Sequence, residues 1–221
     1  MNLIVLDTSS EHLILGVYVR QQLFSLDEPV GQKHAECILP SLAVLLERAG
    51  ATLADINTIA FSSGPGGFTG LRIGCGIAQG LAVAHGLTLM PIPTLDIIAA
   101  DFPDRAVYVC ADARMGQVYS AIYTADRSER SHITLCAPEE LPKPSMPCVG
   151  VGSGFAVYRD ALVAQFGTSM AEYVPDARPQ ASGMLALALS GHYPCVPPEQ
   201  AELLYVRNKI ALTSRERAQK T

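Results

Sequence analysis

The chain has 221 residues, of which 49% are hydrophobic, and a formal net charge of −5. This length and composition exclude intrinsic disorder, and the acidic balance argues against a surface devoted to nucleic acid, since such domains are usually basic. No basic region precedes a signal-like segment, no apolar run approaches the roughly 20 residues of a membrane span, and the six cysteines show no C-x-x-C spacing. We therefore expect a cytoplasmic protein with free, buried thiols.

Apolar runs and chain breakers predict an α/β order of elements in the first half. The expected elements are strands over 2–6, 13–19 and 22–26, a helix over 34–49, a strand over 56–61, a helix over 70–85, a strand over 87–92 and a helix over 95–101. Gly50 and Gly86 are well placed just beyond the ends of the two longer helices.

The second half repeats this alternation. The expected elements are strands over 106–111 and 117–124, a proline-rich loop over 126–147 with room for one short edge strand, a strand over 148–151, and helices over 155–166 and 183–190. We predict an N-terminal lobe over 1–103, a C-terminal lobe over 104–206 and a polar, flexible tail over 207–221.

An offset of 105 residues, without gaps, places Asp112 on Asp7 and matches the apolar residues around both. The same offset matches Leu13 with Val118. Chance similarity between two β-hairpins is one interpretation, and a duplicated α/β unit of about 100 residues is the other. Two such units resemble the actin/hexokinase/heat-shock-70 architecture, an ASKHA or ribonuclease-H-like fold with ATP between two small lobes.

Residues 62–74 read S-S-G-P-G-G-F-T-G-L-R-I-G. A Walker loop is excluded because no lysine occurs between Lys33 and Lys143, and a dinucleotide fingerprint fails at Thr69. Backbone N–H groups near a helix N-terminus can still bind an anion. The candidates for a weak nucleotide or anion site are Asp7, Gly66, Gly67 and Thr69.

Small residues recur every four positions along the following helix. They form two rows, Gly70, Gly74, Ala78 and Ala82 in one, and Gly76, Gly80 and Ala84 in the other. A glycine inside a helix costs about 1 kcal/mol relative to alanine, so these glycines need a packing reason. Close packing inside the subunit and close packing against a partner both remain open.

The glycine stretch resembles the signature of bacterial TsaB (YeaZ-type) proteins. The resemblance covers nearly the whole chain and includes L-D-T-S-S at 6–10, H-A-E-C-I-L-P at 34–40, D-A-R-M-G-Q-V-Y at 112–119 and Y-V-R-N-K-I-A at 205–211. It implies the duplicated ASKHA fold and a role in forming N6-threonylcarbamoyladenosine at position 37 of tRNAs that read codons beginning with A. It also implies a TsaD-type catalytic partner, a TsaE-type ATPase in the larger complex, a homodimer when the chain is alone, and only indirect contact with tRNA.

TsaD carries a metal motif H-x-x-x-H after its own glycine stretch. Thr94 and Ile98 occupy the matching positions here, and neither side chain can anchor a catalytic metal. We therefore expect a non-catalytic assembly subunit with no catalytic residue and no metal. It needs no cofactor of its own, and ATP or ADP is expected only at the partner interface.

The resemblance implies that TsaB pairs with TsaD, or with itself, through packed helices. The predicted partner or dimer interface consists of Ile38, Leu42, Leu45, Arg72, Ile73, Ile77 and Gly80. Arg72 either contacts acidic groups of the partner or remains solvated.

Three alternatives stay open from the residues themselves. An ATP-dependent small-molecule kinase of the same superfamily would use Asp7, Asp112 and the G-V-G-S-G stretch at 150–154, although 221 residues is short for such an enzyme. A metalloprotease lacks its histidines. The basic residues of the tail are either solvated or contact tRNA phosphates; they are Arg207, Lys209, Arg215, Arg217 and Lys220.

Overall fold

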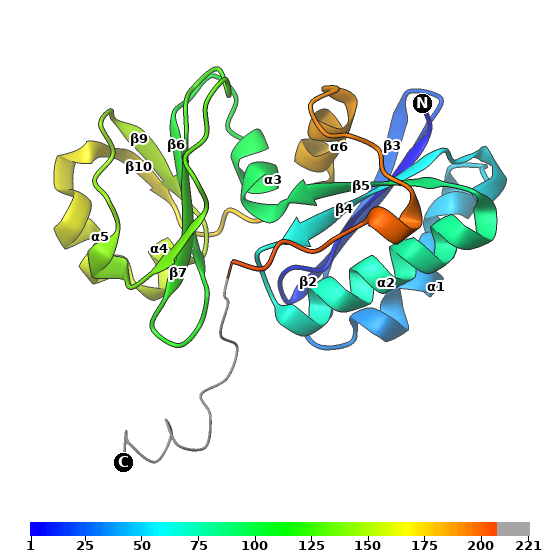
Figure 1. Cartoon of the computed structure of the whole chain (residues 1–221), viewed down its shortest axis with the longest axis horizontal. Coiled ribbons are helices and arrows are strands. Elements are labelled where there is room, and N and C mark those ends of the chain that lie inside the picture. The colour runs from blue at the N-terminus through cyan, green and yellow to red at the C-terminus, as the bar shows by residue number, and fades with distance from the viewer. Residues whose placement is uncertain (207–221) are drawn as a thin grey trace, which may run out of the picture.

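The computed structural model describes residues 1–206, which form two α/β lobes lying side by side (Figure 1). The first lobe contains a five-stranded sheet of β1 (Leu3–Asp7), β2 (His12–Val19), β3 (Gln22–Pro29), β4 (Thr58–Gly64) and β5 (Thr88–Pro93). The second contains β6 (Val107–Asp112), β7 (Val118–Tyr123), β8 (Thr134–Cys136), β9 (Cys148–Val151) and β10 (Met170–Val174). The helices are α1 (His34–Arg48), α2 (Phe68–His85), α3 (Thr94–Ala100), α4 (Gly154–Val157), α5 (Arg159–Phe166) and α6 (Ala181–Leu189).

The two sheets share one topology, which confirms the duplicated fold. Their strand orders are β3-β2-β1-β4-β5 and β8-β7-β6-β9-β10. In the first lobe, β1 pairs antiparallel with β2 and parallel with β4. In the second lobe, β6 pairs antiparallel with β7 and parallel with β9. The constant offset of 105 residues does not hold for the second strand of each lobe, β2 and β7, however. Asp7 pairs with Ile14 and Asp112 with Val118, so the second turn is one residue shorter.

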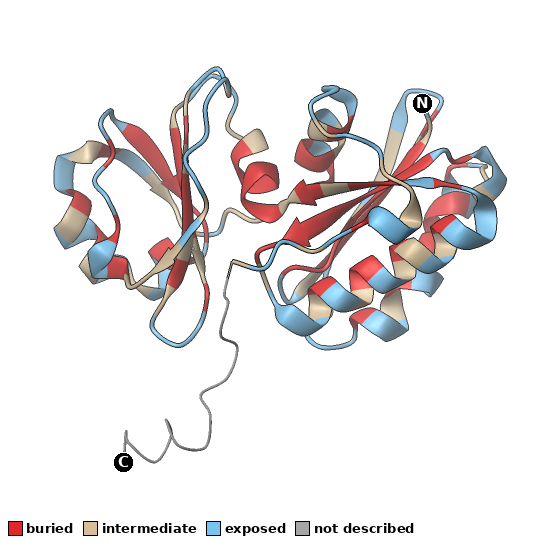
Figure 2. Cartoon of the chain, viewed as in Figure 1, coloured by how far each residue is buried: buried red, intermediate tan, exposed pale blue. Residues whose placement is uncertain are grey.

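Helices cover both faces of each sheet, because buried strands need an apolar layer on either side. In the first lobe, Ile4 and Leu6 of β1 pack toward α1 and α2, while Leu3 and Val5 pack toward α6. All five residues of β1 are buried, and Figure 2 shows the same burial along the central strands of both lobes. In the second lobe, α4 and α5 cover the face of the sheet that points away from the first lobe (Figure 1).

The predicted lobe boundary is wrong at its C-terminal end. Residues 104–206 do not all belong to the second lobe, since Ala181, Met184 and Ala188 of α6 pack against β1 in the first. Val196 then pairs with Leu89 at the edge of β5. The physical reason is that the second face of the first sheet is apolar, and the short helix α3 leaves part of it to be covered by α6 from the end of the chain.

Three local predictions also need correction. Strand β10 was not predicted, because its five residues include exposed Ala171 and Glu172. The helix expected over 155–166 is divided at Tyr158, whose backbone leaves the helical region. All six cysteines are free, as expected, but Cys195 is exposed. The predicted tail at 207–221 lies outside the described residues.

Helix α3 belongs to the cores of both lobes and holds them together. Its Ile97 packs in the first lobe, and its Leu95 and Ile98 pack beneath the second sheet. Between these contacts, the Asp96 carboxylate accepts hydrogen bonds from Tyr123 of β7 at 2.6 Å and from Tyr193 at 2.9 Å. A buried carboxylate with donors from both lobes fixes their relative orientation.

Tyr193→Phe is expected to lower the free energy of unfolding by about 1–2 kcal/mol, because Asp96 loses one donor while Tyr123 and Arg130 remain. Urea unfolding followed by circular dichroism measures this change. An unchanged midpoint and slope would show that the Tyr193 bond does not stabilise the junction between the lobes.

Candidate functional site

The outer surfaces of α1 and α2 form an exposed, apolar surface on the first lobe. Leu39 and Val44 of α1 and Val83 of α2 are exposed by 50%, 52% and 74%. We define the two-helix face by its exposed apolar and small residues, which are Leu39, Pro40, Ala43, Val44, Gly76, Gly80, Val83 and Ala84; Glu36, Glu47 and Arg48 of α1 are exposed as well. Apolar side chains gathered on one surface in this way mark a site of protein association.

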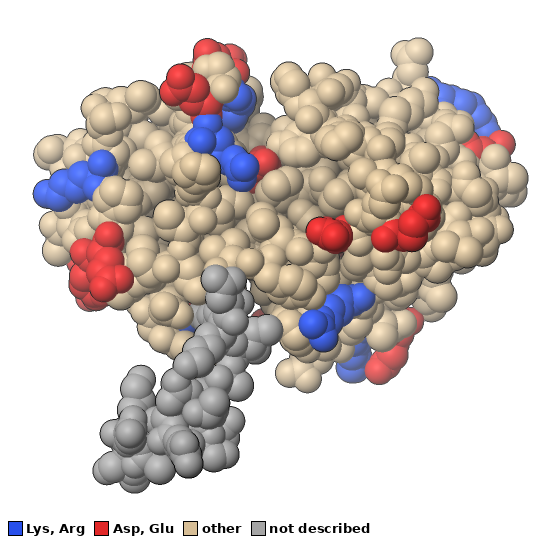
Figure 3. All heavy atoms as spheres, in the orientation of Figure 1, with Lys and Arg blue, Asp and Glu red and all other residues tan. Residues whose placement is uncertain are grey.

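The surface over α2 is largely uncharged (Figure 3). Arg72 is the one Lys, Arg, Asp or Glu among the 18 residues of this helix. Charged residues are depleted in the centres of protein interfaces, so this composition fits a docking surface.

The two rows of small residues on α2 have different environments. A Cβ atom added to Gly70 would lie 2.1 Å from the carbonyl oxygen of Thr8, and one added to Gly74 would lie 2.3 Å from the Thr8 hydroxyl. Cβ atoms added to Gly76 and Gly80 would meet nothing within 4 Å. The first row therefore lets α2 approach the end of β1, and the second row faces outward as a flat, accessible surface.

Three of the predicted interface residues are wrong. Ile38, Leu42 and Leu45 are at most 3% exposed and pack into the core of the first lobe. The apolar stripe that they form faces the sheet, and the exposed stripe of α1 begins one residue later, at Leu39.

The other four predicted interface residues lie at or near the surface. Arg72 and Gly80 are exposed, whereas Ile73 and Ile77 are half-buried and also pack against the core. These four residues remain a prediction, because no partner is present.

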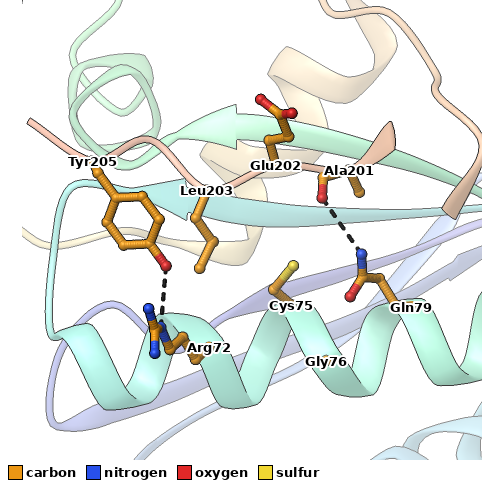
Figure 4. A pocket seen from close by; sticks show the side chains of 8 residues that line it. All are labelled: Arg72, Cys75, Gly76, Gln79, Ala201, Glu202, Leu203 and Tyr205. Atoms are coloured by element: carbon orange, nitrogen blue, oxygen red, sulfur yellow. Dashed lines mark hydrogen bonds between the residues drawn. The ribbon is translucent and has the colours of Figure 1, made fainter. Parts of the chain in front are cut away.

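A groove separates α2 from the C-terminal strap, which we define as residues 196–205. Its volume is about 480 Å³, and Figure 4 shows Cys75 and Leu203 between Arg72 at one end and Gln79 at the other. The Gln79 amide donates to the carbonyl oxygens of Pro198 and Ala201, and the Leu204 N–H donates to the Ser63 carbonyl. These bonds hold the strap along the edge of the two-helix face.

The glycine stretch does not provide the open phosphate cradle that the ASKHA fold implies. A Cβ atom added to Gly66 would lie 2.7 Å from the Ser9 carbonyl oxygen, and the Gly67 N–H donates to that same oxygen. Asp7 is fully buried, whereas Thr69 is exposed. The predicted weak anion site at Asp7, Gly66, Gly67 and Thr69 is therefore not formed as one accessible site.

The second lobe repeats this filled arrangement. Cβ atoms added to Gly152 and Gly154 would lie 2.6 Å from the carbonyl oxygen and 2.5 Å from the sulfur of Cys110. Asp112 accepts a hydrogen bond from Tyr158 and pairs with Arg114. The glycines at both strand ends thus pack against the chain itself, which does not fit an ATP-binding cleft of the kinase type.

No group of three His, Cys, Asp or Glu side chains suited to a metal ion occurs within residues 1–206. Thr94 begins α3, and Ile98 lies in the core of the second lobe. In the same described range, no helix has the length and apolar character to cross a membrane.

Asp7 ends β1 as a carboxyl group with no exposed surface. Burial raises its pKa above the ordinary value, and the Ser62 hydroxyl, hydrogen bonds from Ser9 and the nearby His34 oppose this shift only in part. Its Oδ2 and the Oγ of Ser62 on the neighbouring strand have no hydrogen-bond partner among the described residues. The group therefore costs stability whenever it is charged.

Asp7→Asn is expected to raise the free energy of unfolding by about 1–2 kcal/mol at pH 7, because a buried neutral amide avoids the desolvation penalty of the carboxylate. The native carboxyl binds its proton more tightly than the unfolded one, whose pKa is 3.8. Wild-type stability therefore falls as pH rises above that value, and the advantage of the variant grows. Thermal unfolding from pH 4 to pH 8 measures it; an advantage that does not change with pH would contradict this assignment.

Comparison with known proteins identifies the family. Residues 28–191 match the family model described as TsaD: tRNA N6-adenosine threonylcarbamoyltransferase. The tRNA threonylcarbamoyladenosine biosynthesis protein TsaB of Escherichia coli K12 is 33% identical over 96% of both chains. The chain belongs to the TsaB (YeaZ-type) family.

Solved structures agree with this family assignment. YeaZ from Pseudomonas aeruginosa superposes with a TM-score of 0.81 at 30% identity, over 92% of this chain and 99% of that chain. The ethanolamine utilization protein EutJ from Carboxydothermus hydrogenoformans superposes with a TM-score of 0.51 at 13% identity, over 86% and 90% of the two chains. This distant likeness shows the shared fold alone.

Proposed function

We propose that this chain is an accessory subunit in tRNA threonylcarbamoyladenosine biosynthesis, which binds and supports a TsaD-type catalytic subunit. The two-helix face is the observation that carries the proposal, because it exposes large apolar side chains and accessible glycines on two neighbouring helices beside the glycine stretch. The names of the TsaB relatives support the pathway.

A non-catalytic role is part of this proposal. The positions that match the metal histidines of TsaD hold Thr94 and Ile98, both of which are buried. The glycines that a phosphate group would need are packed against Ser9 and Cys110. These observations favour a subunit that positions a partner over a kinase with its own cleft.

The finer parts of the proposal follow from the same surface. Without its partner, the chain would cover the two-helix face by forming a homodimer. A TsaE-type ATPase joins the larger complex, and tRNA is bound through the complex in the cytoplasm. No cofactor is assigned to this subunit alone, and any adenine nucleotide of the complex would lie at the partner interface.

Reconstitution tests this function. Purified TsaD-type and TsaE-type subunits, tRNA and a threonylcarbamoyl donor are combined with or without this chain, and the modified nucleoside is measured by mass spectrometry. We expect product only when the chain is present, and neither product nor ATP turnover from the chain alone. Equal product without the chain would refute the accessory role, and ATP turnover by the isolated chain with a small-molecule acceptor would favour the kinase alternative.

A further inference from the structure

Arg72 is held in place by two aromatic side chains at the edge of the two-helix face. Its guanidinium carbon lies 3.9 Å from the centroid of the Phe68 ring and 5.8 Å from that of the Tyr205 ring. Its Nε donates to the Tyr205 hydroxyl at 3.1 Å, as Figure 4 shows. Stacking and this hydrogen bond restrict a side chain that is otherwise flexible, so its orientation is set before any ligand arrives.

The remaining N–H groups of this guanidinium are available for a ligand. Within residues 1–206, Arg72 forms no ion pair, although it is the one Lys, Arg, Asp or Glu of α2. The Nε is already bonded to Tyr205, Arg72 is exposed, and its two Nη groups have no hydrogen-bond partner among residues 1–206. Two parallel N–H groups of this kind match the two oxygens of a carboxylate.

We propose that the Arg72 clamp, formed by Arg72, Phe68 and Tyr205, binds an aspartate or glutamate side chain of the TsaD-type partner. This inference rests on the proposed function and names the chemistry that the partner presents at one edge of the two-helix face. Because α2 carries no other Lys, Arg, Asp or Glu, docking against this helix would exclude water around the pair and strengthen it. The pair would also fix the register in which the partner meets α2.

Charge favours a carboxylate of a protein over the phosphates of a nucleic acid. Residues 1–206 contain 11 Lys and Arg against 20 Asp and Glu, which gives a net charge of −9, and the whole chain has a net charge of −5. Glu202 lines the same groove as Arg72. A polyanion would be repelled by this background, whereas a single carboxylate on an apolar partner surface needs only one cation.

The test measures binding of the purified TsaD-type subunit by calorimetry at low and moderate salt. We expect Arg72→Gln to raise the dissociation constant about 30-fold and to make the affinity less dependent on salt. Arg72→Lys keeps the charge but loses the planar fork, so we expect a loss of about 5-fold. Tyr205→Phe removes the hydroxyl that orients Nε, and we expect a loss of about 3-fold.

The outcomes separate this inference from the proposed function. If the wild-type chain does not bind the TsaD-type subunit, both are refuted. If the wild type binds and Arg72→Gln binds equally well at both salt concentrations, the carboxylate site is refuted and the docking surface stands. If Arg72→Gln binds the subunit normally but the complex loses affinity for tRNA, the ligand is a phosphate, which also overturns the carboxylate assignment. Circular dichroism and thermal unfolding of each variant verify that it is folded.

Discussion

Gly70→Ala is expected to lower the free energy of unfolding by about 3 kcal/mol, whereas Gly76→Ala on the same helix is expected to raise it by about 0.5–1 kcal/mol. At Gly70 the new methyl group would lie 2.1 Å from the Thr8 carbonyl oxygen, so α2 must move away from β1. That movement would also weaken the hydrogen bond from the Thr8 hydroxyl to the Gly70 carbonyl. At Gly76 the methyl group enters open space, and alanine favours the helix.

The two substitutions are chemically identical, so each is the control for the other. Urea unfolding at pH 7 measures the free energy of unfolding of both variants. Because both replace glycine by alanine, the effect of the substitution on the unfolded chain is the same in each. If Gly76→Ala were as destabilising as Gly70→Ala, the outward row of small residues would be buried, and the two-helix face would not be open in the free chain.

Gly80→Arg is expected to weaken binding of the TsaD-type subunit at least 100-fold while leaving the chain folded. The position faces open space, so a long side chain is accommodated in the free protein. Against a partner helix, the same side chain would block close approach and bury an unpaired charge. Titration calorimetry with the purified TsaD-type subunit measures the change.

Val163→Arg is the matched control for this substitution. Val163 is a 41% exposed apolar residue on α5 of the second lobe, away from α1 and α2. We expect the Val163→Arg variant to bind the TsaD-type subunit with the affinity of the wild type. If Val163→Arg weakened binding and Gly80→Arg did not, the docking surface would lie on the second lobe.

Sequence periodicity predicts the helices but not the direction in which each apolar stripe faces. The spacing of Ile38, Leu42 and Leu45 is that of a buried stripe, and they are buried. Leu39 and Val44 beside them are equally apolar, so α1 carries apolar residues on both faces. Large apolar residues outside the buried stripe were the available signal that this helix serves two surfaces at once.

Other features depend on contacts between distant parts of the chain. Arg72 and Tyr205 are 133 residues apart, and no local pattern indicates that the strap returns to α2. The same holds for α6, which the linear order assigns to the second lobe although it packs on β1. The repeated sheet topology could be predicted because both halves of the sequence show the same order of strands. The shorter turn before Val118 was missed because the two halves were aligned without gaps.

Docking through the two-helix face is tested most directly by hydrogen exchange of the wild-type chain with and without the TsaD-type subunit, read by mass spectrometry. This measurement needs no substitution and covers both lobes at once. We expect slower exchange in peptides from α1 and α2, with no change in α4 and α5. Protection confined to α4 and α5, with α1 and α2 unchanged, would contradict docking through the two-helix face.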